Sequence, residues 1–247
     1  MKCVITGATS GIGKEFARIL SNKGYELILI GRNKNKLREI KKLGKTLCID
    51  LSKEKDVIKL TKKLKKEKID MVINNAGIGV YGLFKDSKLE EELEMINTNI
   101  IALHILTKFF YQKFLEQNSG ILLNVSSTAA YTVGPFMSSY YATKSYVYKL
   151  TKAIIEENKK LKNNVRISIL LPGPTYTNFN NKLGINFSSK AMTSTEVVEY
   201  TLRQLQKNRQ IIVPGLKNRV LKVLVSLLPE RLTTKINYKI QSSKVIK

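Results

Sequence analysis

Three glycines lie between a short apolar run and an amphipathic stretch near the start of the chain. The run Cys3–Thr6 comes first, the glycines follow within Gly7–Gly13, and the amphipathic stretch covers Ile12–Lys23. Glycine lets the backbone turn tightly and approach a ligand without a Cβ atom in the way. The N–H groups and the dipole at the start of the following helix favour a pyrophosphate. This order of strand, turn and helix predicts a nucleotide site, although a glycine cluster alone also builds ordinary turns.

The same alternation of apolar runs and amphipathic stretches continues along the chain. Short runs without a polar face are typical of parallel strands that helices cover on both sides. Strands are predicted at Cys3–Thr6, Glu26–Ile30, Thr46–Ile49, Met71–Asn74, Ile121–Val125, Arg166–Leu171 and Gln210–Val213. Helices are predicted at Ile12–Lys23, Lys34–Lys42, Glu54–Lys66, Leu89–Leu115, Ser138–Leu161 and Thr195–Lys207. The pattern predicts an α/β fold: a Rossmann-type, doubly wound parallel sheet of about seven strands with helices on both faces.

Neither repeats nor low-complexity linkers divide the sequence, so residues 1–247 are expected to form a single nucleotide-binding domain. The irregular segment 174–192 is expected to form a loop or lid over the substrate. Residues 216–247 form a basic amphipathic extension that Pro229 interrupts. Such an extension can lie on an anionic membrane surface, or it can pack on the domain or on a partner subunit. Packing is the more common fate.

The formal net charge of +24 raises nucleic acid, anionic membranes and anionic ligands as partners. The excess of Lys and Arg lies toward the two ends, while the middle of the chain is almost neutral. No zinc-finger spacing, aromatic RNA-binding signature or basic zipper accompanies it. We interpret most of the charge as solvated helix faces and expect no nucleic-acid partner.

The cysteine and histidine content indicates the redox compartment and limits the kinds of catalytic or metal site. The two cysteines, Cys3 and Cys48, lie in apolar runs and suit a reducing cytosol. The first residues lack the apolar core of a secretory signal, and no stretch approaches the ~18 apolar residues that span a bilayer. We expect a cytoplasmic protein, with peripheral membrane contact through the extension as an alternative. A single histidine, His104, argues against a His-rich metal site or a Ser-His-Asp triad, so no metal is expected.

The end of the second predicted strand indicates which nucleotide is bound. A site for NAD places an acid there to accept hydrogen bonds from the ribose, but this chain has Gly31-Arg32-Asn33. The planar guanidinium of Arg32 suits a 2′-phosphate, and Lys34 and Lys36 add positive potential nearby. The segment favours NADP(H) over NAD(H); the alternative is that Arg32 is a surface residue at the start of a helix.

Two residues of one predicted helix can form an acid-base pair. Tyr140 and Lys144 are four residues apart and share a helix face, whereas Tyr141 is about 100° away. A nearby ammonium favours the phenolate and would lower the pKa of Tyr140 from its ordinary value. Ser127 follows the fifth strand, where α/β sheets bind their ligands, and could hydrogen-bond a substrate carbonyl. A tyrosine four residues before a lysine is common, so the pair alone is weak evidence.

Together these features resemble the short-chain dehydrogenase/reductase family, from about Lys2 to Val213. The spacing of the glycines is similar to the compact single-domain reductase branch. The matching motifs are Thr6-Gly7-x-x-x-Gly11-x-Gly13, Asp50-Leu51, Asn74-Asn75-Ala76-Gly77, Asn99 in Asn97-Thr98-Asn99-Ile100, Ser127 thirteen residues before Tyr140, and Pro172-Gly173-Pro174-Thr175-Tyr176-Thr177. Each motif alone could arise by chance, but together in this order they are highly specific.

The resemblance implies the roles of individual residues. The implied catalytic residues are Asn99, Ser127, Tyr140 and Lys144. The expected cofactor contacts, with Arg32 included, are Gly7, Ser10, Gly11, Ile12, Gly13, Arg32, Asp50, Leu51, Asn75, Ala76, Gly77, Tyr140, Lys144, Pro172, Gly173, Thr175 and Thr177. The implied reaction is hydride transfer from NADPH to a ketone or aldehyde. Tyr140 would donate the proton, Ser127 would position the oxygen, Lys144 would hold the nicotinamide ribose, and Asn99 would support a proton-relaying water.

Three segments are expected to wall the substrate pocket: Ile78–Phe84, Thr128–Met137 and Thr175–Met192. Their apolar members are Val80, Tyr81, Leu83, Phe84, Tyr131, Phe136, Met137, Phe179, Leu183 and Phe187. Few charges occur among them, which favours an apolar carbonyl substrate. A homodimer or homotetramer is expected. The alternative is a non-catalytic NADP-binding or interaction protein on the same fold.

Overall fold

The computed structural model describes residues 1–177, 179 and 191–243 of the chain. Seven parallel strands form one sheet in the order β3-β2-β1-β4-β5-β6-β9. These strands are β1 (Lys2–Thr6), β2 (Glu26–Gly31), β3 (Lys45–Cys48), β4 (Met71–Asn74), β5 (Gly120–Val125), β6 (Val165–Leu170) and β9 (Ile211–Ile212). The strand order reverses between β1 and β4, which is the place where doubly wound sheets bind their ligands.

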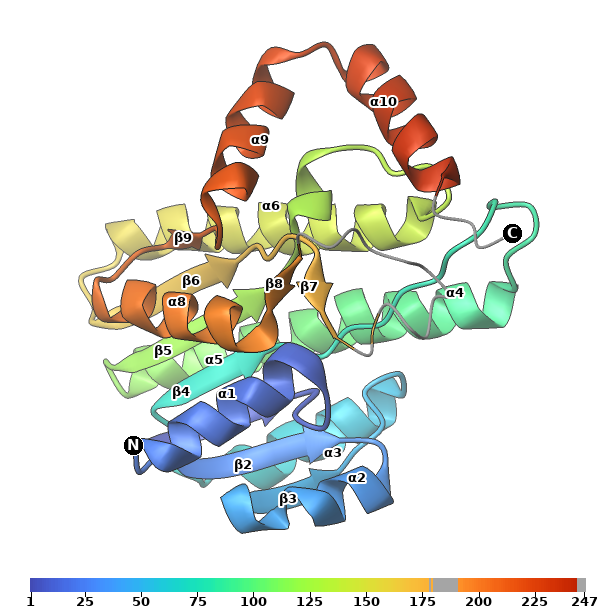
Figure 1. The fold of residues 1–247 in the computed structure, drawn as a ribbon. Helices are drawn as coiled ribbons and strands as arrows, with labels where there is room; N and C mark the ends of the chain where they lie inside the picture. The colour runs from blue at the N-terminus through green and yellow to red at the C-terminus, as the bar shows by residue number, and fades with distance from the viewer. Residues whose placement is uncertain (178, 180–190, 244–247) are drawn as a thin grey trace.

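Helices cover both faces of this sheet (Figure 1). They are α1 (Gly11–Asn22), α2 (Lys34–Glu39), α3 (Glu54–Leu64), α4 (Leu89–Ile96), α5 (Leu103–Glu116), α6 (Ser138–Lys160) and α8 (Ser194–Gln206). One face packs on α1, α2 and α8 through a cluster that includes Phe16, Leu37 and Val197. The other packs on α3, α5 and α6 through a cluster that includes Leu60, Phe110 and Ile155. The predicted doubly wound α/β fold is confirmed.

Local differences from the predicted elements have identifiable causes. The predicted helix Leu89–Leu115 is interrupted by a π-helical segment, η2 (Asn97–Ala102), between α4 and α5. The segment that was expected to be irregular contains two short paired strands, β7 (Thr175–Tyr176) and β8 (Met192–Thr193). Backbone pairing over two residues leaves no periodic signal in a sequence, so these strands could not be predicted.

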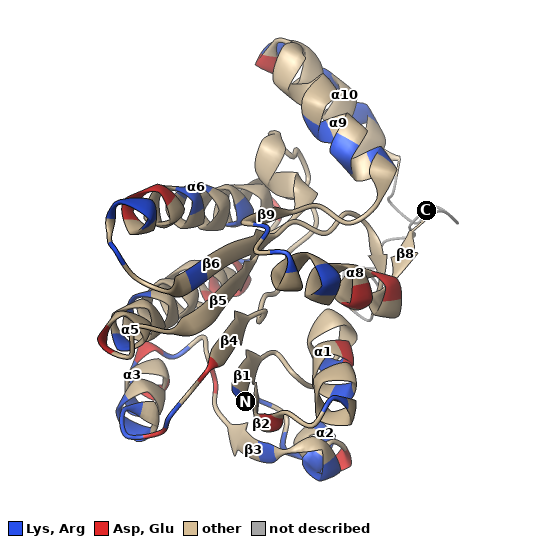
Figure 2. Ribbon diagram, turned by 90° about the vertical axis from the view of Figure 1, so that its left-hand side faces the viewer, with Lys and Arg blue, Asp and Glu red and all other residues tan. Residues whose placement is uncertain are grey.

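The end of the chain forms two helices, α9 (Leu216–Leu227) and α10 (Glu230–Ser242), on either side of Pro229. Figures 1 and 2 show them as a hairpin that projects beyond α6, away from the sheet. No residue of α9 is buried, and α10 buries only Thr233 and Gln241. Eleven large apolar side chains of the described part of the hairpin, Leu216–Ser242, are exposed: Leu216, Val220, Leu221, Val223, Leu224, Leu227, Leu228, Leu232, Ile236, Tyr238 and Ile240.

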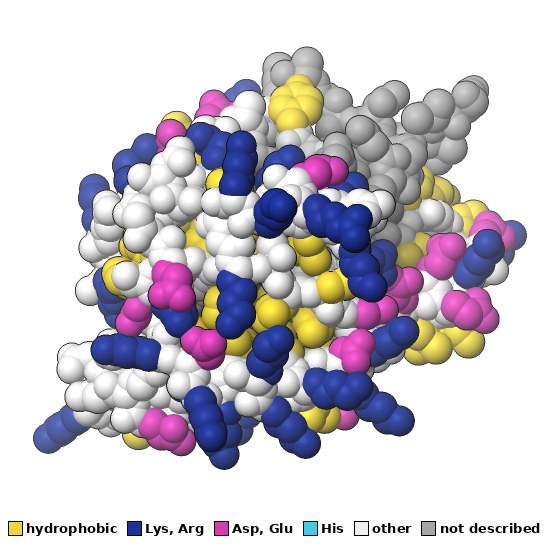
Figure 3. All heavy atoms as spheres, turned by 90° about the horizontal axis from the view of Figure 1, so that it is seen from below, with side chains coloured by type: hydrophobic (Ala, Val, Ile, Leu, Met, Phe, Trp, Pro, Cys, Tyr) yellow, Lys and Arg dark blue, Asp and Glu magenta, His cyan; other side chains and the backbone are white. Residues whose placement is uncertain are grey.

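The basic residues are spread over the surface that the structure describes. The face seen from below carries separate Lys and Arg side chains with acidic and apolar side chains between them, and no continuous basic band (Figure 3). Ion pairs within α3 and α6, such as Lys59–Asp56 and Lys159–Glu156, are of the exposed kind that contributes little to stability. This distribution agrees with the interpretation of the charge as solvated helix faces.

Candidate active site

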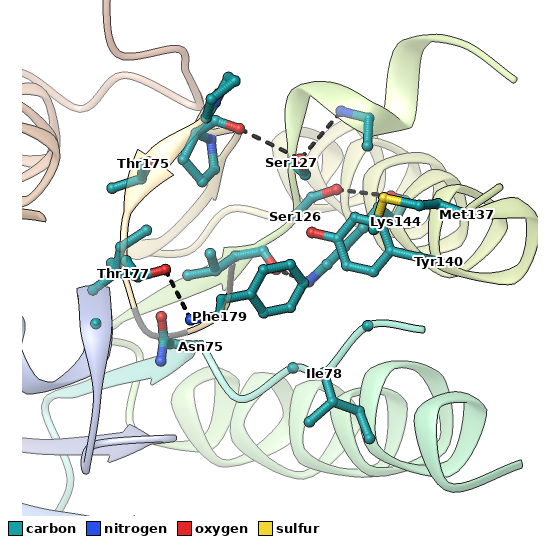
Figure 4. A pocket seen from close by; sticks show the side chains of 18 of the residues that line it. Asn75, Ile78, Ser126, Ser127, Met137, Tyr140, Lys144, Thr175, Thr177 and Phe179 are labelled. Atoms are coloured by element: carbon teal, nitrogen blue, oxygen red, sulfur yellow. Dashed lines mark hydrogen bonds between the residues drawn. The ribbon is translucent and has the colours of Figure 1, made fainter. Parts of the chain in front are cut away.

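A cavity of about 420 Å³ opens at the carboxyl edge of the sheet. The loops that follow β1, β2, β4, β5 and β6 contribute to its wall, together with α4, α6 and α10. Thirteen of the predicted site residues line it: Ser10, Gly11, Ile12, Arg32, Asn75, Gly77, Ser127, Tyr140, Lys144, Pro172, Gly173, Thr175 and Thr177. Figure 4 shows how side chains from these separate segments face one space.

The glycine turn brings the start of α1 to the cavity. Gly7 has φ +66°, in the region that favours glycine. A Cβ atom on Gly13 would lie 2.3 Å from the carbonyl oxygen of Gly7, so only glycine lets the helix pack this closely. Gly7 and Gly13 therefore shape the turn without lining the cavity. Ser10, the N-cap residue of α1, makes no side-chain capping bond to the N–H groups of the first turn. An uncapped N-terminus at a cavity suits an anionic group.

The segment after β4 is tied to the first strand by hydrogen bonds. The backbone N–H groups of Asn75 and Ala76 both donate to the Thr6 hydroxyl at 2.9 Å. The Asn75 side chain also donates to the Thr6 carbonyl at 3.0 Å. These bonds fix the backbone of Asn75, Ala76 and Gly77 beside the glycine turn. Asn75 and Gly77 face the cavity, whereas Ala76 lies behind them.

Asn99 lies in the π-helical segment and is 1% exposed. Its side chain accepts a hydrogen bond from the N–H of Ile78 at 2.9 Å and donates to the Ile78 carbonyl at 2.9 Å. It also donates to the Thr143 hydroxyl, one residue before Lys144. The side chain does not line the cavity. Asn99 therefore joins the loop after β4 to α6, and π-helical turns of this kind are frequent at functional sites.

Ser127 and Ser126 point in different directions after β5. The Ser127 hydroxyl faces the cavity, where it donates to the Pro172 carbonyl at 3.4 Å and accepts from the N–H of Ala129 at 3.1 Å. The Ser126 hydroxyl is buried and donates to the Lys144 carbonyl at 2.7 Å. The long bond from Ser127 leaves its hydroxyl able to turn toward a ligand, whereas Ser126 holds α6 against β5.

Tyr140 and Lys144 lie one helical turn apart on α6, with the Lys144 Nζ 5.7 Å from the centre of the Tyr140 ring. The Lys144 Nζ donates to the Val125 carbonyl at 3.3 Å. Burial raises the pKa of the Tyr140 phenol to about 12, while a hydrogen bond from Ser127 acts in the lowering direction. Burial also lowers the pKa of the Lys144 ammonium to about 8.

Burial therefore opposes the lowering of the Tyr140 pKa that was expected from Lys144, and the pKa is raised. Both groups lose hydration when they are buried, and this loss disfavours each charged form. Burial is the largest cause of the raised pKa of Tyr140, so the phenol is protonated at neutral pH. A protonated phenol at a cavity can donate a proton to a ligand oxygen.

Arg32 reaches across the cavity to an acid that the sequence analysis did not consider. Its guanidinium forms an ion pair with the carboxylate of Glu94 on α4, and both residues line the cavity with Lys36 and Glu91. The cavity therefore holds both signs of charge at this end. The pair joins the turn after β2 to α4, two segments far apart in the sequence, and no sequence spacing could reveal it.

Other expected contacts lie outside the cavity or outside the described residues. Asp50 does not line the cavity, and its carboxylate accepts hydrogen bonds from the N–H and hydroxyl of Ser52. Leu51 is buried in the core. The expected pocket residues Leu83 and Phe84 are exposed to solvent. Leu183 and Phe187, with most of the expected loop 174–192, lie outside the described residues. Tyr141 and Gln241 line the cavity although the sequence analysis did not select them.

The comparison with a family model decides the family. The model described as short chain dehydrogenase matches residues 2–186. The chain belongs to the short-chain dehydrogenase family. Its members are oxidoreductases, and estradiol 17-beta-dehydrogenase 11 of Mus musculus is 30% identical over 251 aligned positions, covering 96% of this chain and 83% of the mouse protein.

Solved structures of short-chain dehydrogenases share the fold. A short-chain dehydrogenase from Sphingobium yanoikuyae in complex with NADPH superposes with a TM-score of 0.82 and 25% identity, covering 93% of this chain and 96% of that one. A short-chain dehydrogenase/reductase from Burkholderia phymatum in complex with NAD gives a TM-score of 0.80 at 22% identity, covering 90% and 92%. Structures of this fold therefore hold either nicotinamide cofactor.

The described residues were expected to contain neither a membrane-spanning helix nor a metal site. Among the described residues, no helix is long and apolar enough to cross a bilayer. Within the same part of the chain, no three His, Cys, Asp or Glu residues are grouped so that they could hold a metal ion. His104 instead hydrogen-bonds the Tyr146 hydroxyl at 2.7 Å, between α5 and α6.

The low pKa of Lys144 predicts a pH-dependent effect on stability. Below pH 8 the fold must bury an ammonium, and this cost disappears as the pH rises from about 8 toward the ordinary value of 10.5. Lys144→Met should therefore raise the melting temperature at pH 7 by a few degrees, and the gain should shrink between pH 8 and pH 10. Thermal unfolding at several pH values measures this.

Lys149→Met, at an exposed position of the same helix, is the matched control and should change the melting temperature equally little at every pH. A lower melting temperature of Lys144→Met at pH 7, or a difference that does not depend on pH, would contradict the assignment of a buried, destabilised ammonium.

Proposed function

We propose that this short-chain dehydrogenase is an NADPH-dependent carbonyl reductase. It would reduce a ketone or aldehyde on an apolar substrate to the alcohol. The observation that carries the proposal is the convergence of Ser127, Tyr140 and Lys144 on one cavity, next to the uncapped start of α1. A non-catalytic binding protein has no need of a protonated phenol and a hydroxyl that face the same space.

Three parts of the cavity wall would bind a dinucleotide: the start of α1, Lys144, and the turn at Pro172 and Gly173. The uncapped N–H groups at the start of α1 would hold the pyrophosphate, and a Cβ atom on Gly13 would close the turn that exposes them. Lys144 would bond the ribose next to the nicotinamide, and the turn at Pro172 and Gly173 would support the ring. The bound cofactor supplies a hydride for the carbonyl carbon.

The proton for the carbonyl oxygen would come from Tyr140. The phenol is protonated at neutral pH, as a general acid must be before it donates. The Ser127 hydroxyl would bond the same oxygen and stabilise the charge that develops there. The Lys144 ammonium, 5.7 Å from the Tyr140 ring, would stabilise the phenolate left behind. Asn99 would position these groups by joining the Ile78 loop to α6, and a water relay through it remains a prediction.

The substrate class is inferred from the wall of the cavity. The side chains of Ile78, Val80, Met137 and Phe179 face it, and the Phe179 ring lies 5.5 Å from that of Tyr140 (Figure 4). An apolar wall beside three polar groups is typical of a site that orients a mainly apolar ligand by one carbonyl.

Replacement of Tyr140 by Phe tests the acid role. Tyr140→Phe should reduce turnover of ketones by at least about a hundredfold, because general acid catalysis contributes on that order. NADPH binding, measured by fluorescence titration, should change little. Retained turnover in this variant would contradict the assignment of the acid.

We further propose that the enzyme prefers NADP(H) through Arg32. No acid follows β2, and Arg32 and Lys36 line the cavity. The Glu94 carboxylate competes with a 2′-phosphate for the guanidinium, so the preference would depend on displacing this ion pair.

Two substitutions should change NADPH affinity in opposite directions. Arg32→Ala should weaken NADPH binding about tenfold or more with little effect on NADH, because a charge-assisted bond to the 2′-phosphate is lost. Glu94→Gln should tighten NADPH binding and leave NADH unchanged. Calorimetric titration of both cofactors measures this, with Arg38→Ala, outside the cavity, as the control for general charge. Tighter binding of NADH than of NADPH by the wild type would refute the preference.

We also propose that the α9–α10 hairpin contacts an anionic membrane surface. The hairpin leaves its large apolar side chains exposed, and Lys217, Arg219, Lys222, Lys235 and Lys239 lie among them. This combination of exposed leucines and basic residues is typical of interfacial helices. Contacts such as the Asn237–Val133 hydrogen bond join the hairpin to the domain, but they leave most of its large apolar side chains exposed. Homodimer or homotetramer formation stays a prediction that light scattering tests.

Sedimentation with vesicles tests this contact. The wild type should pellet with vesicles that contain phosphatidylserine and not with pure phosphatidylcholine. Leu224→Asn/Leu227→Asn should abolish pelleting, while Leu161→Asn, at an exposed apolar position at the end of α6, should not. A wild type that stays in the supernatant, or that self-associates through Leu224 and Leu227 instead, would overturn the membrane proposal.

A further inference from the structure

The last turn of α10 places one polar side chain in the wall of the cavity. Gln241 is 3% exposed and lines the cavity together with Tyr140 and Tyr141. It lies beyond residue 186, where the match to the family model ends.

Several contacts hold this end of α10 in place. The Tyr81 hydroxyl donates to the backbone carbonyl of Gln241. The Asn237 side chain donates to the Val133 carbonyl at 2.8 Å, and the ring of Tyr238 lies 5.4 Å from that of Phe136. The helix is therefore bound to the loops that follow β4 and β5, and these loops also build the cavity. Its position at the cavity is fixed by contacts outside the proposed catalytic residues.

Gln241 forms a polar pair with Tyr141. Its amide nitrogen donates to the Tyr141 hydroxyl at 2.6 Å. The Tyr141 ring is seated against Gly134, where a Cβ atom would lie 2.3 Å from the ring, and it meets the Tyr140 ring edge-on at 6.2 Å. The pair therefore lies next to the proposed acid, Tyr140, and the ring of Tyr141 packs closely against Gly134.

One polar atom of the Gln241–Tyr141 pair lacks a hydrogen-bond partner among the described residues. Among the residues that the structure describes, no group donates a hydrogen bond to the buried amide oxygen of Gln241. Leaving such an atom unpaired costs stability, so a partner for it is expected when the protein works. The terminal amide torsion of a glutamine is soft, and a rotation can turn the oxygen into the cavity without moving the helix.

We propose that Gln241 and Tyr141 form a polar subsite that binds a hydroxyl group on the substrate, remote from the reacting carbonyl. A pair made of one amide and one phenol offers both an acceptor and a donor, whichever way the amide is turned. A hydroxyl both donates and accepts, so it satisfies the pair in either arrangement. The inference rests on the proposed reductase function and narrows its substrate to apolar hydroxy ketones.

Matched pairs of ligands test this subsite. Each pair is a 2-alkanone and the same ketone with a terminal hydroxyl. The chain length runs from hexanone to dodecanone, so that the series scans the distance between the carbonyl and the hydroxyl. Binding to the NADPH-saturated protein is measured by calorimetry, and turnover is measured in parallel. For at least one length, the wild type should bind the hydroxylated ketone about tenfold more tightly than its partner.

In Gln241→Met, the methionine side chain is close to glutamine in shape but lacks the amide. It should reduce the preference to about twofold or less, mainly by weakening binding of the hydroxylated ketone, while affinity for the plain ketone is kept or improved. Ser242→Ala, the next residue of the helix, is the control and should keep the preference. Tyr141→Phe should reduce the preference without the large loss of turnover expected for Tyr140→Phe.

The outcomes separate the subsite from the proposed function. Equal binding of the two ketones by the wild type at every length, no binding of either, or a preference that survives in Gln241→Met would overturn the subsite. Turnover of ketones without such a preference would leave the reductase proposal standing and refute the subsite. A preference that depends on Gln241 in a protein without turnover would support the subsite and refute the reductase proposal.

Discussion

The parallel direction of all seven strands is the constraint on which the site depends. Because the strands run the same way, the loops that follow them collect at one edge of the sheet. The glycine turn, the Asn75 segment, Ser127 and the Pro172 turn are far apart in the sequence, and only this shared edge brings them to one cavity. The hydrogen bonds from Asn75 and Ala76 to Thr6 and from Asn99 to Ile78 then fix the loops relative to one another.

Burial sets the protonation states of Tyr140 and Lys144 on α6. It moves the pKa of Tyr140 up and the pKa of Lys144 down, so each group is nearer to its neutral form than it would be in water. The stability lost by burying Lys144 is of the kind often found at functional sites, where a local arrangement that is unfavourable for folding serves a reaction. This explains why a helix that is otherwise well packed retains a buried lysine with one long bond to a carbonyl.

The sequence was most informative where local periodicity decides the structure. The seven strands of the sheet and the flanking helices follow from apolar runs and amphipathic stretches, and the glycine turn follows from the space that a Cβ atom would fill. The π-helical turn at Asn99 could not be predicted, because it depends on contacts between Asn99 and Ile78. The Arg32–Glu94 pair and the position of Gln241 also depend on tertiary packing. The raised pKa of Tyr140 could not be predicted either, because spacing reveals the neighbouring charge of Lys144 but not the depth of burial.

In the proposed reaction, a hydride would pass from NADPH to a carbonyl carbon in this cavity, and a proton would pass from Tyr140 to the carbonyl oxygen. Mass spectrometry of the product formed from NADPH that carries deuterium at the reactive position of the nicotinamide tests this most directly. With an apolar ketone as substrate, we expect the wild type to form an alcohol with one deuterium on the carbinol carbon. Absence of the alcohol for every ketone and aldehyde tried, or an alcohol without deuterium on that carbon, would contradict the account.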